Sequence, residues 1–374
     1  MPGVSLLVVT VPGPVERDGS HIRLSAKTLS GLEHFARYWP GDVVHVTDTT
    51  GFGSHQVLGT RTAQVDELGY ATVFADDRVE AIHQLRPDVV LTTLAMSELP
   101  LMEGLRVPWV AITEYDLKTR FEWARAERSG RLPSPRHTAF LLRLERRYRR
   151  ALRRAAGIQA NGWPSYATYR GLANSPLLFF DSRISEHMLE LASGKRDDDA
   201  LTLAFSGRWI RPKGIEHAIA AFAIARGRSD RELRLELFGS GPHQIESPAP
   251  DGITVRGDVD YETEWVPHVA ANVDLLLAPH LQSDPACTYL EAAALGAPFL
   301  SFDNRAAEWL ARHHQLGWTA PMGDVHALAD LIVDITGNDD AIEASRQAAR
   351  TFMANHTMEQ EFARRAEHLA ACAH

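Results

Sequence analysis

Short runs of apolar, often β-branched residues alternate with amphipathic helical stretches along most of the chain, and this alternation strongly limits its possible folds. In the first half, the expected strands are Leu6–Val11, Val43–Thr47, Ala71–Phe74, Val89–Thr92, Trp109–Ile112, Ile158–Ala160 and Leu177–Phe180. Helical patterns lie between them, such as Ser25–Tyr38, in which Leu29, Leu32 and Phe35 share one face. Buried strands separated by helices indicate a parallel sheet that is covered on both faces.

The alternation begins again after a polar stretch at residues 182–199. The second set of expected strands is Leu201–Phe205, Leu233–Phe238, Ile253–Val255, Leu275–Ala278 and Phe299–Phe302. The sequence therefore predicts two Rossmann-like α/β domains, at residues 1–183 and 200–356, joined by a linker at residues 184–199. Residues 357–374 are expected to form one more amphipathic helix. Because parallel sheets bind ligands at the carboxyl ends of their strands, a ligand is expected between the two domains.

Length and composition place the chain among ordinary globular proteins. Its 374 residues suit two domains. No apolar run approaches the roughly 20 residues that cross a bilayer, and no basic residue precedes the opening strand, unlike in a signal peptide. Two cysteines, Cys287 and Cys372, provide neither a disulfide framework nor a zinc-finger spacing. These features predict a cytoplasmic location, and the net charge of −9 argues against nucleic-acid binding.

One segment is strongly basic. Residues 118–154 contain 13 Lys or Arg and three Glu. Within this segment, the helical pattern of Arg136–Ala155 has four apolar residues in phase, which are Leu141, Leu144, Tyr148 and Leu152. Such a helix can lie on an anionic membrane, which would make the location peripheral at the inner membrane face. It can also receive an anionic acceptor, or pack on the core with a solvated basic side, and the sequence leaves these interpretations open.

Two loops of the second half suit a phosphate ligand. The strand at Leu201–Phe205 runs into residues 206–214, where Arg208 and Lys213 offer two cations that can stabilise charge on a diphosphate leaving group. These side chains can also be merely solvated. The second loop, residues 238–242 (Phe-Gly-Ser-Gly-Pro), allows a tight turn, although many strand-to-helix turns have a similar sequence.

A third element spans residues 278–298. A short helix is expected to begin at Cys287, Thr288 and Tyr289, where free backbone N–H groups can bind an anion. Glu291 follows about one turn later, where its carboxylate can accept hydrogen bonds from two ribose hydroxyls. Glu291 can alternatively be an ordinary surface residue of the helix.

These three elements, in this order, resemble the donor domain of the family-four glycosyltransferases of GT-B fold, the glycosyl transferases group 1. The family's Gly-Arg…Lys-Gly loop, Gly-x-Gly-Pro turn and Glu-Ala-x-Ala-x-Gly-x-Pro helix match residues 207–214, 239–242 and 291–298. The resemblance is close over about residues 201–331 and loose over the N-terminal half. It implies an α/β GT-B fold, in which two Rossmann-like domains face each other across a cleft and the last helix crosses back to the first domain.

The resemblance also implies a function. The chain would be a hexosyltransferase-type enzyme that moves a sugar from a UDP- or GDP-linked donor to an acceptor hydroxyl, with retention of configuration. The acceptor would be a small molecule, a glycan or a lipid-linked molecule, and neither a metal ion nor another cofactor would be needed. Arg208 and Lys213 would hold the diphosphate and Glu291 the ribose. The other implied donor contacts are Gly19, Gly207, Gly239, Val259, Asp284, Cys287, Thr288 and Tyr289.

The chain departs from the family pattern at two positions. A second glutamate is common eight residues before Glu291, where this chain has Ser283. The neighbouring Asp284 can reach the sugar hydroxyls, or it can cap a helix that begins at Pro285. Many relatives place a histidine after the strand at residues 109–112, where the best match here is Glu114. This carboxylate can orient the acceptor hydroxyl or stabilise positive charge on the sugar, or it can cap a helix.

Other interpretations remain open. The resemblance places the loop at residues 12–20 under the donor phosphates, with Gly19 allowing close approach. His21 is expected in the first turn of the following helix or in contact with the donor. A sugar-nucleotide epimerase or hydrolase on the same fold, or a non-catalytic nucleotide-sugar-binding relative, would fit the same motifs. A dinucleotide-dependent oxidoreductase does not fit, because no Gly-x-Gly-x-x-Gly follows the first strand.

Overall fold

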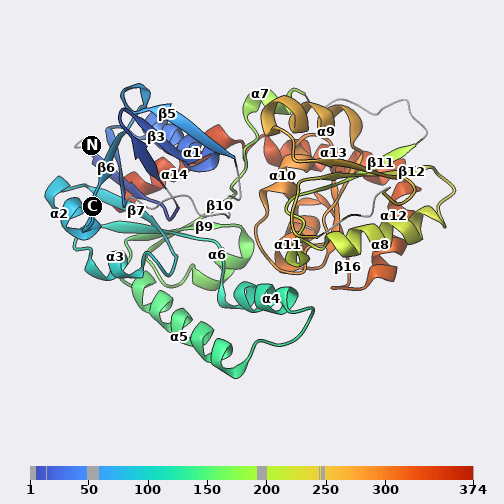
Figure 1. The fold of residues 1–374 in the computed structure, drawn as a ribbon, viewed down its shortest axis with the longest axis horizontal. Helices are drawn as coiled ribbons and strands as arrows, with labels where there is room; N and C mark the ends of the chain where they lie inside the picture. Colours follow the sequence, from blue (N-terminus) through green and yellow to red (C-terminus); the bar gives the residue numbers. More distant parts are fainter. Residues whose placement is uncertain are drawn as a thin grey trace. The chain divides into compact units, whose positions relative to one another are not determined.

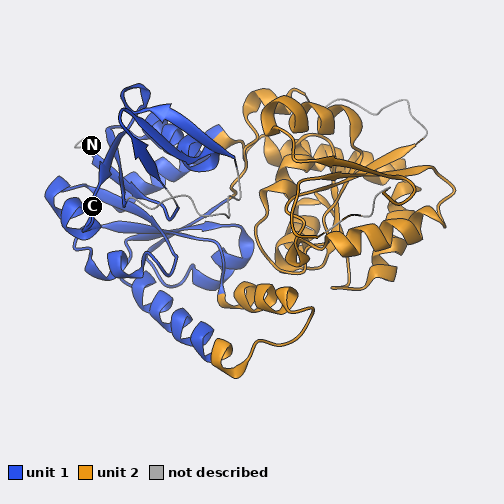
Figure 2. Ribbon diagram, in the orientation of Figure 1, with its two compact units in different colours: residues 1–116, 139–179, 359–374 blue, residues 117–138, 180–358 orange. Residues whose placement is uncertain are grey.

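A computed structural model describes residues 6–13, 15–48, 59–191, 200–243, 245 and 249–373. The chain forms two compact units (Figure 2). Unit 1 comprises residues 1–116, 139–179 and 359–374, and unit 2 comprises residues 117–138 and 180–358. Residues 117–138 and 180–183 thus lie in unit 2, although the sequence prediction placed them in the N-terminal domain. Residues 192–199 of the predicted linker lie outside the described residues.

Unit 1 contains a seven-stranded parallel sheet with the order β10-β9-β8-β7-β1-β4-β6. Its strands are β1 (Leu6–Thr10), β4 (Asp42–Thr47), β6 (Ala71–Phe74), β7 (Val89–Thr93), β8 (Trp109–Thr113), β9 (Gly157–Asn161) and β10 (Ser175–Phe179). Each of them overlaps a strand expected from the apolar runs. The helices of this unit are α1 (Ala26–Tyr38), α2 (Arg78–Leu85), α3 (Leu99–Gly104), α5 (Pro135–Leu152), α6 (Trp163–Tyr169) and α14 (Met358–Cys372), with a 3-10 turn at Val65–Glu67.

A small antiparallel sheet in unit 1 was not predicted. It consists of β2 (Glu16–Asp18), β3 (His21–Ser25) and β5 (Thr60–Gln64). The expectation that His21 opens a helix was wrong, since His21 begins strand β3. Ile22 and Leu24 are buried there while Arg23 points outward, which is the period of two of a half-buried strand. Helix α1 begins only at Ala26, after the side chain of Ser25 caps its first turn.

Unit 2 contains a six-stranded parallel sheet with the order β13-β12-β11-β14-β15-β16. Its strands are β11 (Leu201–Ser206), β12 (Leu233–Phe238), β13 (Ile253–Gly257), β14 (Leu275–Leu277), β15 (Phe299–Phe302) and β16 (Gly317–Ala320). Its helices are α4 (Leu117–Glu127), α7 (Glu186–Leu189), α8 (Ile215–Arg226), α9 (Val266–Asn272), α10 (Cys287–Ala294), α11 (Arg305–His314), α12 (Val325–Thr336) and α13 (Asp339–Met353), with a 3-10 turn η2 (Arg211–Lys213) and a π-helix η3 (Tyr261–Trp265).

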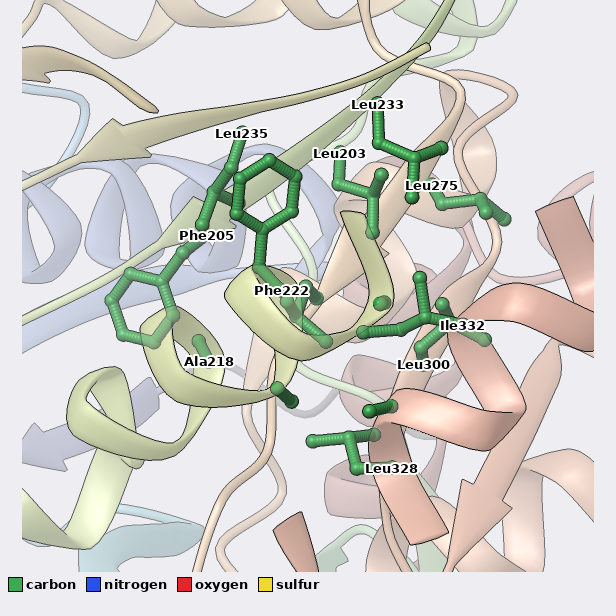
Figure 3. Packing of buried hydrophobic residues seen from close by; sticks show 14 of the residues in the cluster. Leu203, Phe205, Ala218, Phe222, Leu233, Leu235, Leu275, Leu300, Leu328 and Ile332 are labelled. Atoms are coloured by element: carbon green, nitrogen blue, oxygen red, sulfur yellow. The ribbon is translucent and has the colours of Figure 1, made fainter. Parts of the chain in front are cut away.

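The strands of unit 2 pack on α8 and α12, which also contact each other. Figure 3 shows Phe222 of α8 and Ile332 of α12 beside Leu203, Leu235 and Leu275 of the sheet. This core is separate from that of unit 1, which gathers around β1, β7, β8 and α5. Each unit therefore has a hydrophobic core of its own, as expected for two α/β domains.

The last helix, α14, belongs to unit 1, as the resemblance implied (Figure 1). Phe362 packs edge-on against Phe35 of α1, with 5.0 Å between the ring centroids. Arg365 donates from Nε to the side chain of Gln159 in β9 at 2.8 Å, and its guanidinium lies 4.2 Å from the ring centroid of Phe179. Buried aromatic and charge-assisted contacts thus fix α14 on the sheet of the first unit.

Candidate functional site

The strand order of unit 2 changes direction between β11 and β14, and this switch point is where doubly wound sheets bind ligands. The loop after β11 ends in η2, and the loop after β14 leads to α10. The two loops meet there, because Lys213 Nζ lies 2.8 Å from Asp284 Oδ2. Both side chains are mostly buried. The structure therefore brings together two of the residues that the sequence predicted to contact the donor.

Glycines let the loops after β11 and β12 approach each other closely. Gly239 has φ 105°, and a Cβ at this position would collide with the carbonyl oxygen of Gly207. The backbone N–H of Trp209 donates to the carbonyl of Ser240 at 2.7 Å, which joins the two loops. Gly214 has φ 74° and abuts the backbone of Pro279, so a larger residue could not turn the chain from η2 into α8.

Arg208 lies in the same loop as Lys213 and contacts α4. Its guanidinium carbon is 5.7 Å from the ring centroid of Trp123, within the range of a cation–π interaction. The two predicted diphosphate ligands therefore have different environments, because Lys213 has a carboxylate partner and Arg208 has an aromatic ring.

Asp284 does not cap α10. The N-cap residue is Ala286, which forms no side-chain cap hydrogen bond, and the helix begins at Cys287 rather than at Pro285. The alternative that Asp284 is the helix cap was therefore wrong: its carboxylate accepts from Lys213 instead. Ala286 provides no side-chain cap for the first turn of α10, and a helix start without such a cap can bind an anion.

The first three residues of α10 differ in what they can offer to a ligand. Cys287 and Thr288 are half-buried, whereas the side chain of Tyr289 is 1% exposed. The Tyr289 hydroxyl lies within 3.3 Å of the carbonyl of Ala278 and within 3.1 Å of Ser301 Oγ. The Tyr289 side chain is thus part of the core, and its backbone N–H donates to the carbonyl of Ala286 at 3.3 Å.

Glu291, the predicted ribose ligand, is bound by an arginine that the sequence analysis did not single out. Arg183 donates from Nε to Glu291 Oε1 at 3.0 Å and from Nη2 to Oε2 at 3.3 Å. Burial by itself lowers the pKa of Arg183, but the Glu291 carboxylate raises it, and the net shift is upward, so the guanidinium remains charged. The two residues are 108 positions apart, so no local sequence pattern could indicate this pair.

The region expected to contact the nucleobase continues into η3. Val259 lies just after β13, and Tyr261 begins the π-helix, with the side chain of Asp260 capping its first turn. The guanidinium of Arg183 lies only 3.5 Å from the ring centroid of Tyr261. Burial, and then the negative charge of Glu291, raise the pKa of the Tyr261 hydroxyl well above its ordinary value.

Helix α4 contributes further contacts that the sequence analysis missed. Glu122 accepts from the backbone N–H of Ser283 at 2.9 Å, and its other carboxylate oxygen is 3.7 Å from Nε of Arg305. Arg305 also donates to the hydroxyl of Thr119 at 2.9 Å. A carboxylate therefore lies beside the backbone of Ser283, the position at which the family pattern has a glutamate, but it comes from a distant segment.

His280 is a buried titratable group in the loop after β14. Complete burial lowers its pKa well below the ordinary value of 6.5, and the charge of Lys213 lowers the pKa further. Neither ring nitrogen has a hydrogen-bond partner in the part of the chain that the structure describes. The imidazole is therefore neutral at pH 7 and packs against Tyr289, with 5.0 Å between the ring centroids.

Two predicted site residues lie in unit 1. Glu114 follows β8, and its Oε1 accepts from the side-chain amide of Asn161, at the end of β9, at 3.3 Å. Both residues are thus at the carboxyl ends of adjacent strands, where such sheets bind ligands. Gly19 occupies the turn between β2 and β3 with φ 57°.

Within the described ranges, no group of three or more His, Cys, Asp or Glu side chains could hold a metal ion. The metal independence implied by the family resemblance stays a prediction. None of the described helices is both long and apolar enough to cross a membrane.

Comparison with known proteins relates this geometry to a family. Residues 200–338 match the sequence model of the family described as glycosyl transferases group 1. No curated protein sequence matches the chain significantly. The matched region contains the loops after β11, β12 and β14, and therefore all the donor-site residues predicted in unit 2.

Solved structures with a similar fold cover nearly the whole chain. HepE from Anabaena, crystallised in complex with UDP, is 13% identical, with a TM-score of 0.67 over 98% of this chain and 100% of that one. Sucrose-phosphate synthase from Thermosynechococcus elongatus is 15% identical, with a TM-score of 0.66 over 98% of both chains. WaaG, a glycosyltransferase involved in lipopolysaccharide biosynthesis, is 11% identical, with a TM-score of 0.62 over 97% of this chain and 99% of that one.

The fold and the matched region together define a class: an α/β protein with the GT-B glycosyltransferase fold. Over residues 200–338, the resemblance to the glycosyl transferases group 1 is confirmed. The predicted fold class is therefore confirmed.

Proposed function

We propose that this chain transfers a hexosyl group from a nucleoside diphosphate sugar to an acceptor hydroxyl, with retention of configuration. The observation that carries the proposal is the Lys213–Asp284 contact at the switch point between β11 and β14. It places an ammonium group beside Asp284 in the loop that leads to α10, three residues before the helix begins at Cys287, within the region that matches the glycosyl transferases group 1. An anion with two phosphates suits such a site.

The proposed chemistry uses charge stabilisation. As the bond between the sugar and the diphosphate breaks, negative charge grows on the diphosphate, and Lys213 and Arg208 stabilise it. An oxygen of the leaving phosphate takes the proton from the acceptor hydroxyl. Glu114, at the end of β8, orients the acceptor or stabilises positive charge on the sugar. Arginine and lysine thus take the role that a divalent ion has in other transferases.

HepE provides the first donor to test. Its structures contain UDP, UDP with glucose, and UDP-glucose. A UDP-hexose is therefore the first choice, and GDP-hexoses form the second arm of the panel. The acceptor is a small molecule, a glycan or a lipid-linked molecule, and the basic helix α5 would bring the protein to an anionic membrane surface at the inner face if the acceptor is lipid-linked.

A thermal-shift screen of UDP- and GDP-sugars tests the donor, because a ligand that binds only the folded state raises the unfolding temperature. Product analysis with the stabilising donor then follows, with and without acceptors. Transfer that needs an acceptor supports the proposal. Donor turnover in the absence of any acceptor would instead identify an epimerase or hydrolase.

The environment of the donor residues also favours a second candidate, a non-catalytic nucleotide-sugar-binding protein. Ser283 stands where the family has a glutamate, and Lys213 and Glu291 both have partners within unit 2. Donor binding in calorimetry, without transfer or hydrolysis for any acceptor class, would favour this candidate.

A further inference from the structure

Arg183 and Glu291 form a contact that the proposed donor site cannot keep when it is filled. Glu291 Oε1 accepts from the backbone N–H and from Nε of Arg183, at 3.3 and 3.0 Å, and Oε2 accepts from Nη2 at 3.3 Å. The side chain of Glu291 is 1% exposed, whereas that of Arg183 is 31% exposed. Arg183 contacts both carboxylate oxygens, and the Glu291 side chain is almost completely buried, so we expect ribose hydroxyls to reach it only after the guanidinium moves.

The same guanidinium covers an aromatic ring. Its central carbon lies 3.5 Å from the ring centroid of Tyr261, which also stacks with Trp265 at 5.3 Å between centroids. Tyr261 is two residues beyond Val259, where the nucleobase is expected, and it opens a π-helix, a distortion that is frequent at functional sites. A flat nucleobase could stack on this ring only where the flat guanidinium now lies.

We propose that Arg183 is an internal substitute for the nucleoside half of the donor, and that it must leave Glu291 and Tyr261 before a nucleotide binds. This inference rests on the proposed function. The planar guanidinium stands in for the base on Tyr261, and its N–H groups stand in for the ribose hydroxyls on Glu291. Arg183 thereby sets the affinity of the protein for its donor.

A buried hydroxyl supports this assignment. The Tyr261 hydroxyl is buried near the Glu291 carboxylate, which raises its pKa, but it makes no hydrogen bond of normal length and angle with any of the residues that the structure describes. An unpaired buried hydroxyl is unfavourable, because it has lost water without gaining another partner. A ligand hydroxyl that replaces the guanidinium near Glu291 can provide this missing partner.

The backbone around Arg183 is anchored, so the release is a rotation of the side chain. Phe180 packs edge-on against Phe352, with 5.3 Å between the ring centroids. The carbonyl of Ile184 accepts from the backbone N–H of Met358 at 2.8 Å. These contacts hold the residues on either side of Arg183 within unit 2, whereas its guanidinium is partly exposed and can rotate into solvent.

Affinity is the direct measure of such competition. If only the released state binds the donor, the observed Kd equals the intrinsic Kd divided by the fraction of molecules in that state. Isothermal calorimetry with UDP, GDP and inorganic pyrophosphate would compare the wild type with Arg183→Ala and Arg183→Lys. The matched control is Arg231→Ala, which removes another partly buried ion pair of unit 2, formed with Asp339 at 2.7 Å.

Arg183→Ala is expected to bind the preferred nucleotide about tenfold more tightly than the wild type, or about 1.4 kcal/mol. Arg183→Lys, which keeps the charge but not the planar group, should show a smaller increase in nucleotide affinity. The affinity for pyrophosphate should not change, because pyrophosphate does not compete with Arg183. Arg231→Ala should bind all three ligands as the wild type does.

Equal or weaker nucleotide binding by Arg183→Ala would overturn the proposal, and weaker binding would make Arg183 a direct donor contact. If thermal unfolding shows that Arg183→Ala does not fold, the nucleotide affinity of Arg183→Lys is used instead. A Kd of Arg183→Lys at or above the wild-type value then overturns the proposal. If neither nucleotide binds the wild type or a folded variant, the proposed function fails together with this inference. If a nucleotide binds but the Arg183 variants do not bind it more tightly than the wild type, this inference is overturned and the proposed function is not.

Discussion

Each of the two charged side chains most central to the proposed donor site is paired with a group of opposite charge inside unit 2. Lys213 is paired with Asp284 at 2.8 Å, and Glu291 with Arg183 at 3.0 Å. A charged side chain that is largely removed from water is stable only with such a partner. In the free protein these pairs therefore keep the charges of the site in place, and a bound donor must replace or share the partner of each one.

Replacing Lys213 tests its role as a diphosphate ligand. Lys213→Ala should lower kcat by roughly 10²- to 10³-fold, the usual cost of losing one group that stabilises transition-state charge. Arg211→Ala is the matched control, because it removes a more exposed cation of the same loop and should change kcat less than about twofold. Steady-state kinetics would measure both variants, with circular dichroism to confirm folding.

Glu291→Ala should chiefly raise the donor KM, since the ribose contact contributes to binding. Full activity in both Lys213→Ala and Glu291→Ala would refute the assignment of the donor site.

His45 in β4 predicts a dependence of stability on pH. Burial, and then the charge of Arg78, lower the pKa of His45 from 6.5 to about 4. Above pH 6.5 the residue is neutral in both the folded and the unfolded chain, and its contribution to stability is complete. As the pH falls from 6.5 to 4, only the unfolded chain takes up the proton, so stability decreases by up to roughly 3 kcal/mol.

Between pH 7 and pH 5, the loss attributable to His45 should be about 2 kcal/mol. His45→Leu removes the titrating group, so its free energy of unfolding should decrease less over this interval than that of the wild type. Urea denaturation at the two pH values would measure the difference. An identical pH dependence in the two proteins would exclude His45 as the source.

Among the elements, α4 has the least expected position. Strand β8 before it and all but the first four residues of α5 after it belong to unit 1, whereas α4 contacts η2 of unit 2. Glu122 and Trp123 connect α4 to Ser283 and Arg208, which belong to the loops after β14 and β11. Helix α4 therefore contributes to the conformation of both loops that flank the switch point.

Glu122→Gln should raise the KM for the donor about fivefold and change kcat less, because it weakens a charge-assisted hydrogen bond that positions the backbone at Ser283. The control is Glu127→Gln, which alters an exposed residue near the end of the same helix. Initial rates at varied donor concentration would separate the two parameters. A KM equal to that of the wild type would show that α4 does not position the donor loop.

Helix α5 is the element that would reach a membrane. Its buried side contains Leu144 and Tyr148, as the sequence predicted, while Phe140 and Leu142 are exposed beside several arginines. An exposed basic surface with apolar side chains is typical of a helix that lies on an anionic lipid surface. Membrane contact stays a proposal.

Charge reversal tests this proposal. The variant that combines Arg143→Glu, Arg146→Glu and Arg150→Glu should bind vesicles containing phosphatidylglycerol at least about tenfold more weakly than the wild type. The control reverses three exposed arginines of unit 2, which are Arg228, Arg234 and Arg312. Unchanged sedimentation of the α5 variant with the vesicles would remove the membrane interpretation.

At the scale of the whole molecule, two separate cores predict two unfolding steps. Leu203, in the core of unit 2, and Leu152, in the core of unit 1, are both fully buried. Replacing either one by Ala should cost about 2–5 kcal/mol and lower only the transition of its own unit. A saturating nucleoside diphosphate should raise only the transition that Leu203→Ala lowers.

Differential scanning calorimetry of the wild type, Leu203→Ala and Leu152→Ala, with and without the nucleotide, would measure these shifts. A single transition that moves equally with both substitutions would show that the two units unfold together.

Much of this organisation could be predicted from the sequence. The apolar runs identified the strands of both parallel sheets except β16, because buried parallel strands are nearly continuous in apolar residues. The small sheet of β2, β3 and β5 was missed, since its strands are short and mostly polar. The loops at residues 206–214 and 238–242 were identified because their glycines and cations follow strands directly.

The sequence by itself determined the α/β class, the two sheets and the three loops of the proposed donor site, because these depend on local periodicity and turn chemistry. Only the tertiary structure decided which partners the charged residues have. Asp284 accepts from Lys213 instead of capping α10, and Glu291 is covered by Arg183. The pairs join residues 71 and 108 positions apart, and such contacts depend on the path of the whole chain rather than on any local pattern.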